Sequence, residues 1–137
     1  MIRSILAVLL GIVALTISSF AIEAVTNPIL FRLFPDALPN SQAISRNTPA
    51  AIFLFSYSLM CVAFGGYVTA WVARRLEVRH ALIMGVIQAV LTIFAMQAFR
   101  DQAPMKVWII SMLMTTPAAW LGGLIRANQI RRHVSPA

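Results

Sequence analysis

One acidic side chain stands inside an apolar stretch of this sequence, and it is the first candidate for chemistry. Glu23 lies near the end of the stretch 4–25, and Gln88 lies in the middle of another, 80–99. Ionisable residues within apolar segments are rare, because a charge away from water is costly, and they often mark substrate, ion or proton sites. Glu23 with Gln88 is therefore a candidate coupling site for a proton or a cation.

The alternative for Glu23 is a structural ion pair. The helical rise places it about 13 Å from the middle of its stretch, against a hydrocarbon half-thickness of about 15 Å. At that depth its carboxylate can reach interfacial water, or pair with Arg32 or Arg100. We favour this interpretation, and the coupling site is the second hypothesis.

Other patterns of catalysis or metal binding are not found. His80 and His133 stand beside arginines, with no carboxylate or cysteine at ligand spacing. The single cysteine, Cys61, has no disulfide partner, and Gly65-Gly66 and Gly122-Gly123 lack the lysine of a phosphate loop. We therefore expect no catalytic site, no cofactor and no metal, and we predict that the chain is not an enzyme.

Long apolar stretches dominate the chain. About 20 helical residues cross a hydrocarbon core of roughly 30 Å, and each stretch is long enough to do so. The composition agrees, since 60% of the 137 residues are hydrophobic and 11% are charged, against roughly 25% charged in soluble domains. We predict one all-α domain over residues 1–137, a transmembrane four-helix bundle. Its spans are expected at about 4–25, 50–73, 80–99 and 107–125.

The first span also has features of a signal peptide, namely Arg3 and small residues near a possible cleavage site. Its length favours an uncleaved span. Asn27-Pro28 is expected to end it, because the residue before a proline is biased away from helix. In the outer loop 27–49, we predict one or two interfacial turns over 28–34 and irregular structure over 35–49.

Positive charge is unequally divided between the two sides that these spans define. The net charge is +7, and the side with more basic residues in short loops is cytoplasmic by the positive-inside rule. Both termini are therefore predicted to be cytoplasmic, in a multi-pass protein of a bacterial inner membrane. Nucleic-acid binding is not expected, since no aromatic residues interleave with the basic clusters. The seven basic residues of one side are Arg3, Arg74, Arg75, Arg79, Arg126, Arg131 and Arg132, and the four of the other are Arg32, Arg46, Arg100 and Lys106.

Small residues recur at helical spacing in the spans. Such faces let helix backbones approach closely in lipid, where packing drives association. Polar groups are nearly absent from the middle of the predicted spans. We therefore hypothesise an interaction protein: an accessory or assembly subunit of a membrane complex, or a self-associating bundle. The alternative is a small proton- or cation-coupled transporter that uses Glu23. The expected helix-packing glycines are Gly65, Gly66, Gly85, Gly122 and Gly123.

The expected partners are membrane lipids and either other membrane subunits or a second copy. Arg74, Arg75, Arg131 and Arg132 are predicted to contact lipid headgroups. These arginines also belong to an internal echo, because Gly65, Gly66, Ala70, Arg74 and Arg75 recur 57 residues later in the same order. A duplicated helical hairpin would explain the echo. Convergence explains it too, since membrane helices favour interior glycine and arginine at the inner end.

The chain resembles a group of small bacterial four-span membrane proteins of unknown function. The resemblance is carried by Glu23 late in the first span, by Gly65-Gly66 followed by Arg74-Arg75, and by His80-Ala81. It implies the four-span fold and no activity. Four spans with one glutamate in the first also resemble the small multidrug resistance transporters, but the loop 27–49 is longer and the charge bias clearer than in that family.

Overall fold

The computed structural model describes residues 2–38, 41–73, 76–98 and 104–134, and within these ranges the chain is helical without a strand. Four of its helices are long and apolar enough to cross a membrane, and a short fifth lies between the first two of them. In chain order they are α1 (Ile2–Leu33), α2 (Ser41–Arg46), α3 (Thr48–Ala73), α4 (Glu77–Ala98) and α5 (Met105–Val134).

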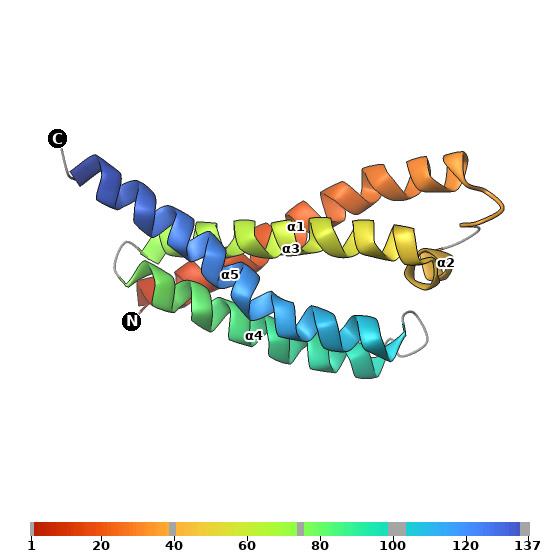
Figure 1. Cartoon of the computed structure of the whole chain (residues 1–137). Coiled ribbons are helices and arrows are strands. Elements are labelled where there is room, and N and C mark those ends of the chain that lie inside the picture. The colour runs from red at the N-terminus through yellow and green to blue at the C-terminus, as the bar shows by residue number, and fades with distance from the viewer. Residues whose placement is uncertain (1, 39–40, 74–75, 99–103, 135–137) are drawn as a thin grey trace.

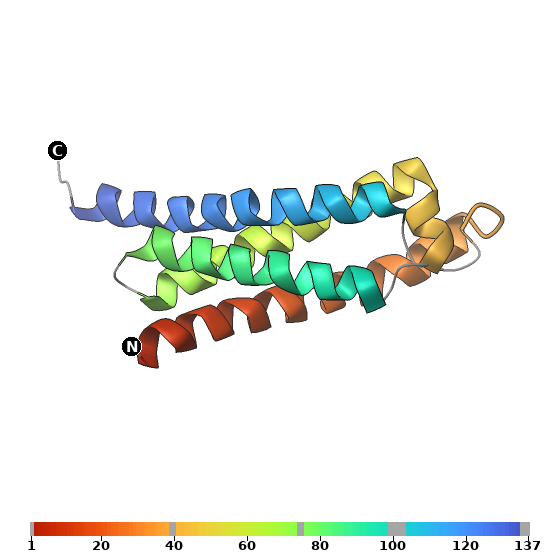
Figure 2. The same ribbon diagram turned by 90° about the horizontal axis from the view of Figure 1, so that it is seen from below.

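The long helices form two antiparallel pairs, α1 with α3 and α4 with α5. The pairs pack on each other mainly through α3 and α5, with a smaller contact between α3 and α4. The start of α1 and the end of α5 lie at one end of the bundle, which we call the terminal end, and α2 lies at the other, the α2 end (Figures 1 and 2). In Figure 1 the two pairs cross near the terminal end and diverge toward the α2 end.

The α1 helix is longer than predicted. It continues through Asn27-Pro28 and ends at Leu33, so the prediction that it stops at the proline was wrong. Pro28 lacks the N–H that would bond to the Ala24 carbonyl, which weakens one turn. Tertiary packing keeps the helix going, because the next turn places Leu30 and Phe31 against an apolar cluster at the α2 end.

That cluster also explains α2, which forms where irregular structure was predicted. Ile44 of α2 is only 1% exposed and packs with Leu38 and Ala50. Asn47 then caps α3, since its Oδ1 accepts a hydrogen bond from the Ala50 amide at 3.4 Å, a role for which asparagine is well suited. Burial of Ile44 in this cluster accounts for the position of α2, and the Asn47 cap marks the start of α3.

The other spans agree with the prediction, except that α5 continues to Val134 rather than ending at 125. It runs through Pro117 and changes direction along its length in Figure 1, as expected for an interior proline. Leu76, directly before α4, has a φ of 53°. This left-handed conformation costs a residue with a side chain about 1–2 kcal/mol.

Candidate functional site

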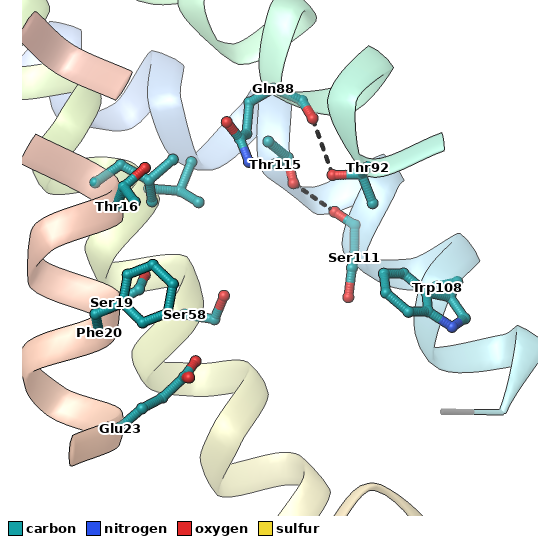
Figure 3. Close-up of a pocket in the computed structure, with 12 residues that line it drawn as sticks. Thr16, Ser19, Phe20, Glu23, Ser58, Gln88, Thr92, Trp108, Ser111 and Thr115 are labelled. Atoms are coloured by element: carbon teal, nitrogen blue, oxygen red, sulfur yellow. Dashed lines mark hydrogen bonds between the residues drawn. The ribbon is translucent and has the colours of Figure 1, made fainter. Parts of the chain in front are cut away.

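A cleft of about 350 Å³ lies between the two helix pairs, in the half of the bundle nearer the α2 end. Figure 3 shows α1 and α3 on one side of it and α4 and α5 on the other. Its polar lining distinguishes it from the other surfaces between these apolar helices. Nine lining residues carry polar side-chain atoms: Thr16, Ser19, Glu23, Ser58, Gln88, Thr92, Trp108, Ser111 and Thr115; the apolar ones are Leu15, Phe20 and Val62.

Helical periodicity brings these side chains together. Residues three or four apart lie on one face of a helix, and every wall of the cleft is such a face. On α1 the polar positions are 16, 19 and 23, and on α5 they are 108, 111 and 115. Ser58 is followed by Val62 four residues later on α3, and Gln88 by Thr92 on α4. The helices α1, α4 and α5 therefore each present a polar stripe to the same space, and α3 adds the single hydroxyl of Ser58.

Sequence reasoning identified Glu23 and Gln88 and missed the other members of the cleft. The expectation that polar groups are nearly absent from the middle of the spans was wrong. The signal was present in the spacing of Thr16, Ser19 and Glu23. Serine and threonine change the hydropathy of a span little, and only their repetition on one face of each helix indicates a shared polar surface.

Glu23 is half-buried in the cleft wall, and the structure does not support the ion pair with Arg32. Arg32 follows Glu23 by nine positions, which amount to two and a half turns and about 13.5 Å of rise along the continuous α1. Arg32 therefore lies on the opposite face of the helix, where it is exposed. The second predicted partner, Arg100, lies outside the described residues.

The extension of α1 also changes the depth of Glu23. Arg3 and Arg32 flank the apolar segment of α1, and the midpoint of this segment falls between Ile17 and Ser18. Glu23 is then about 8 Å from the midpoint along the axis, rather than about 13 Å. This is well inside a hydrocarbon half-thickness of about 15 Å, so the carboxylate depends on the cleft for polar surroundings.

Among the described residues, four buried polar side-chain atoms have no hydrogen bond of strict geometry, and three of them lie in or near the cleft; the fourth is Arg126 Nε. The Tyr57 hydroxyl, on a side chain only 8% exposed, has no hydrogen bond of strict geometry, but it lies close enough to Glu23 for the two side chains to interact. The indole Nε1 of Trp108 and Oδ1 of Asn27, one turn beyond Glu23 on α1, are two others. A buried polar atom left unpaired costs about 1–3 kcal/mol. A bound polar molecule or water would recover part of that cost.

The cleft is rich in hydrogen-bond acceptors. Its threonine hydroxyls donate to carbonyls of their own helices: Thr92 to Gln88 at 2.9 Å and Thr115 to Ser111 at 2.7 Å. The oxygen atoms keep lone pairs that can accept a bond from a ligand. Glu23 contributes a carboxylate, and no basic side chain lines the cleft among the described residues, which do not include Arg100. The chemistry of the cleft therefore favours a cation, or a solute that donates hydrogen bonds.

Glycine packing closes the bundle on the terminal side of the cleft. Leu15 and Val62, each 5% exposed, form the inner boundary. Beyond them a Cβ on Gly65 would lie 2.8 Å from the Gly11 carbonyl oxygen, and a Cβ on Gly66 would overlap the backbone of Ala119. Backbones this close leave no room for a continuous path through the bundle.

All five glycines predicted to pack helices lie at such contacts within the chain. Gly122 meets the backbone of Ala63, and a Cβ on Gly85 or Gly123 would lie 2.9 or 2.6 Å from the side chain of Ala119 or Ala81, respectively. The small-residue faces are thus used to join the helices of one chain. They supply no argument for a partner subunit.

The remaining candidate residues lie away from the cleft. His80 is at the start of α4, with its Nδ1 3.0 Å from the Leu76 carbonyl, and Cys61 is a buried free thiol. Within the described residues no cluster of three metal-ligating side chains occurs. Arg131 and Arg132 are exposed near the end of α5. Arg74, Arg75 and the side chain of His133 lie outside the described part of the chain.

Comparisons with models of protein families, with curated proteins and with solved structures found no match in any of the three. The resemblance to small bacterial four-span proteins therefore stays an expectation, as does the duplication of a hairpin. The functional argument depends on the geometry of the cleft.

Proposed function

We propose that this chain is a membrane carrier for a small polar solute, with Glu23 as the site of a coupling proton or of a positively charged group. One observation carries the proposal: polar side chains of all four long helices meet in a single cleft, whose described lining has one carboxylate and no basic side chain. This develops the second of the two hypotheses from the sequence. The first, an accessory subunit or self-associating bundle, loses the support of the glycine faces.

The shape of the bundle supports a carrier over a channel. The cleft occupies one half, and the other half is closed by backbone contacts between the helix pairs at Gly66 and Gly122. In carriers, two such bodies rock around a central site, so that the site opens to one side at a time. The α1/α3 and α4/α5 pairs would be these bodies, and the bundle would be in its state open toward the α2 end.

A screen of small solutes for thermal stabilisation of the purified protein in detergent tests the proposal. A ligand that binds only the folded protein raises its stability in proportion to the logarithm of its concentration. We expect hits among small cations and hydrogen-bond donors, and we expect Ser58→Leu, which fills the cleft, to abolish the shift. Ser56→Leu is the matched control, because Ser56 is exposed and bonds only to the Ile52 carbonyl of its own helix.

Each solute found in the screen is then tested for uptake into proteoliposomes that contain the protein. Accumulation that depends on Ser58 and Glu23 would support a carrier. Binding without uptake would make the protein a solute receptor. A solute site in this cleft would be contradicted if the screen gave no hit and Ser58→Leu had the same melting temperature as the wild type.

A further inference from the structure

A second surface, unrelated to the polar cleft, lies between α1 and α4 near the terminal end. It is a groove of about 370 Å³, and nearly all of its lining is aliphatic. Val8 and Ile12 line it from α1, and Ile83 and Ile87 line it from α4. At the terminal end it stops at Ser4 and His80, which are its only polar lining residues. An apolar groove with a polar end matches the shape of a lipid rather than that of a soluble ligand.

The groove exists because α1 and α4 belong to different helix pairs and make little contact. Exposed side chains form its rims, including Ile5 at 61%, Leu9 at 54% and Ile83 at 51%. Its length from Ser4 to Ile12 is about 12 Å by helical rise. That is most of the roughly 15 Å thickness of one hydrocarbon leaflet, so one acyl chain can lie along it.

The charge at the polar end selects the headgroup. Arg3 adjoins Ser4, and its Nε donates to the Val72 carbonyl at 3.3 Å, which leaves the terminal guanidinium nitrogens for a ligand. Arg79 is exposed and lies one turn before Ile83, so it stands above the groove on the same face of α4. The Nδ1 of His80 faces the Leu76 carbonyl at 3.0 Å, and its Nε2 has no partner among the described residues.

The acidic residue at this end, Glu77, is a neighbour of His80, three residues later on the same side of α4, but not of Arg79. Glu77 begins α4, and its carbonyl oxygen lies 3.8 Å from a Cβ built on Gly123 of α5. Its backbone therefore faces α5. Arg79, two residues further along the helix, lies about 160° around the axis from Glu77 on the side away from that contact.

We propose that the α1/α4 groove binds one anionic phospholipid, with an acyl chain along Val8, Ile12, Ile83 and Ile87 and the phosphate at Arg3, Arg79 and His80. Arginine suits phosphate because its planar guanidinium donates two parallel hydrogen bonds. The site would be occupied in the leaflet at the terminal end, and its occupant would bridge the two helix pairs where they touch least.

Titration of the purified protein with defined lipids, followed by native mass spectrometry and thermal melting, tests the site. We expect phosphatidylglycerol to bind as one molecule and to raise the melting temperature, while phosphatidylcholine binds more weakly. Arg3→Gln and Arg79→Gln should each weaken phosphatidylglycerol binding about fivefold, as expected for one basic residue at an anionic membrane surface. Arg46→Gln with Lys106→Gln, two exposed basic residues at the α2 end, is the matched control and should change binding at this site little.

Two further arms separate the lipid from other occupants. Free glycerol phosphate should give no shift at the same concentration, because it lacks the acyl chain. A second copy of the chain is the other alternative. In a Cys61→Ala background, Leu9→Cys on the rim of the groove should not form disulfide-linked dimers, because a lipid rather than a second copy covers this surface. Any one of four results would overturn the proposal. Phosphatidylcholine could bind as well as phosphatidylglycerol, or glycerol phosphate could give an equal shift. A variant with both Arg3→Gln and Arg79→Gln could bind fully, or Leu9→Cys could form dimers efficiently. The melting temperature without lipid shows that the variants remain folded.

Discussion

Among single residues, Glu23 is the acidic side chain that lies in the polar cleft of the described part of the chain. Its carboxylate is half-buried at a depth where it depends on the cleft, and none of the described lining residues is basic. An unpaired charge away from bulk water destabilises the folded state. An ionisable side chain at this depth, without a basic partner among the described residues, is a candidate for function rather than for folding.

We therefore predict that Glu23→Gln does not destabilise the protein and raises its free energy of unfolding by up to about 1 kcal/mol. The same variant should lose any thermal shift caused by cationic solutes. Thermal melting with and without such solutes measures both effects, and Asp36→Asn is the control, because Asp36 is fully outside the helices and exposed. A large loss of stability in Glu23→Gln would mean that the carboxylate has a structural partner.

A second prediction concerns Leu76, whose left-handed backbone favours glycine. The side chain is 60% exposed, so its removal costs little packing, and Leu76→Gly relieves about 1–2 kcal/mol of steric strain. Glycine adds freedom to the unfolded chain, which offsets part of this gain. We expect a net stabilisation of about 0.5–1 kcal/mol in denaturant titrations, and none for Leu76→Ala, which retains the Cβ. A Leu76→Gly variant less stable than Leu76→Ala would refute the strain argument.

At the scale of helices, the contacts between α3 and α5 hold the two pairs together. Glycine is needed at these contacts because a Cβ on Gly66 or Gly122 would enter the facing backbone. In lipid, helices associate through close packing rather than through the hydrophobic effect, so a lost contact of this kind is not replaced by burial elsewhere.

Gly66→Leu and Gly122→Leu should therefore destabilise the bundle more than Leu59→Ala. Truncating a fully buried leucine to alanine costs about 2–5 kcal/mol, and Leu59→Ala should cost no more than that. Leu59 is half-buried and packs at the margin of the core. Met60→Leu serves as the control for a leucine on α3, because Met60 is 73% exposed. Wild-type melting temperatures for both glycine variants would show that the helices can separate at these points without cost.

The four spans were predictable from sequence because each is a long apolar stretch of sufficient length for a bilayer. The continuation of α1 was not, because Pro28 is a local signal and the packing of Leu30 and Phe31 against Ile44 is tertiary. The cleft was missed for a related reason. Thr16 and Ser58 lie 42 residues apart on different helices, and neither position alone indicates that their polar faces meet.

At the scale of the whole molecule, the bundle has two unlike halves. The half nearer the terminal end is joined by glycine contacts, and the half nearer the α2 end holds the polar cleft. A bundle built for rigidity alone would be packed along its whole length. Because of this asymmetry, the orientation of the bundle in the membrane determines from which side the cleft is accessible.

The orientation is the last prediction. The sequence assigns seven basic residues to the side of the two termini and four to the other side. By the positive-inside rule, we predict that the terminal end is cytoplasmic and that the cleft opens outward. In a Cys61→Ala background, a membrane-impermeant thiol reagent added to intact cells should label Ala37→Cys and should not label Asn128→Cys. Both positions are exposed, Ala37 at the α2 end and Asn128 in the last turns of α5. Labelling after permeabilisation controls for access, since both cysteines must then react. The opposite labelling pattern would place the cleft on the cytoplasmic side, and labelling of both in intact cells would indicate a protein that inserts in two orientations.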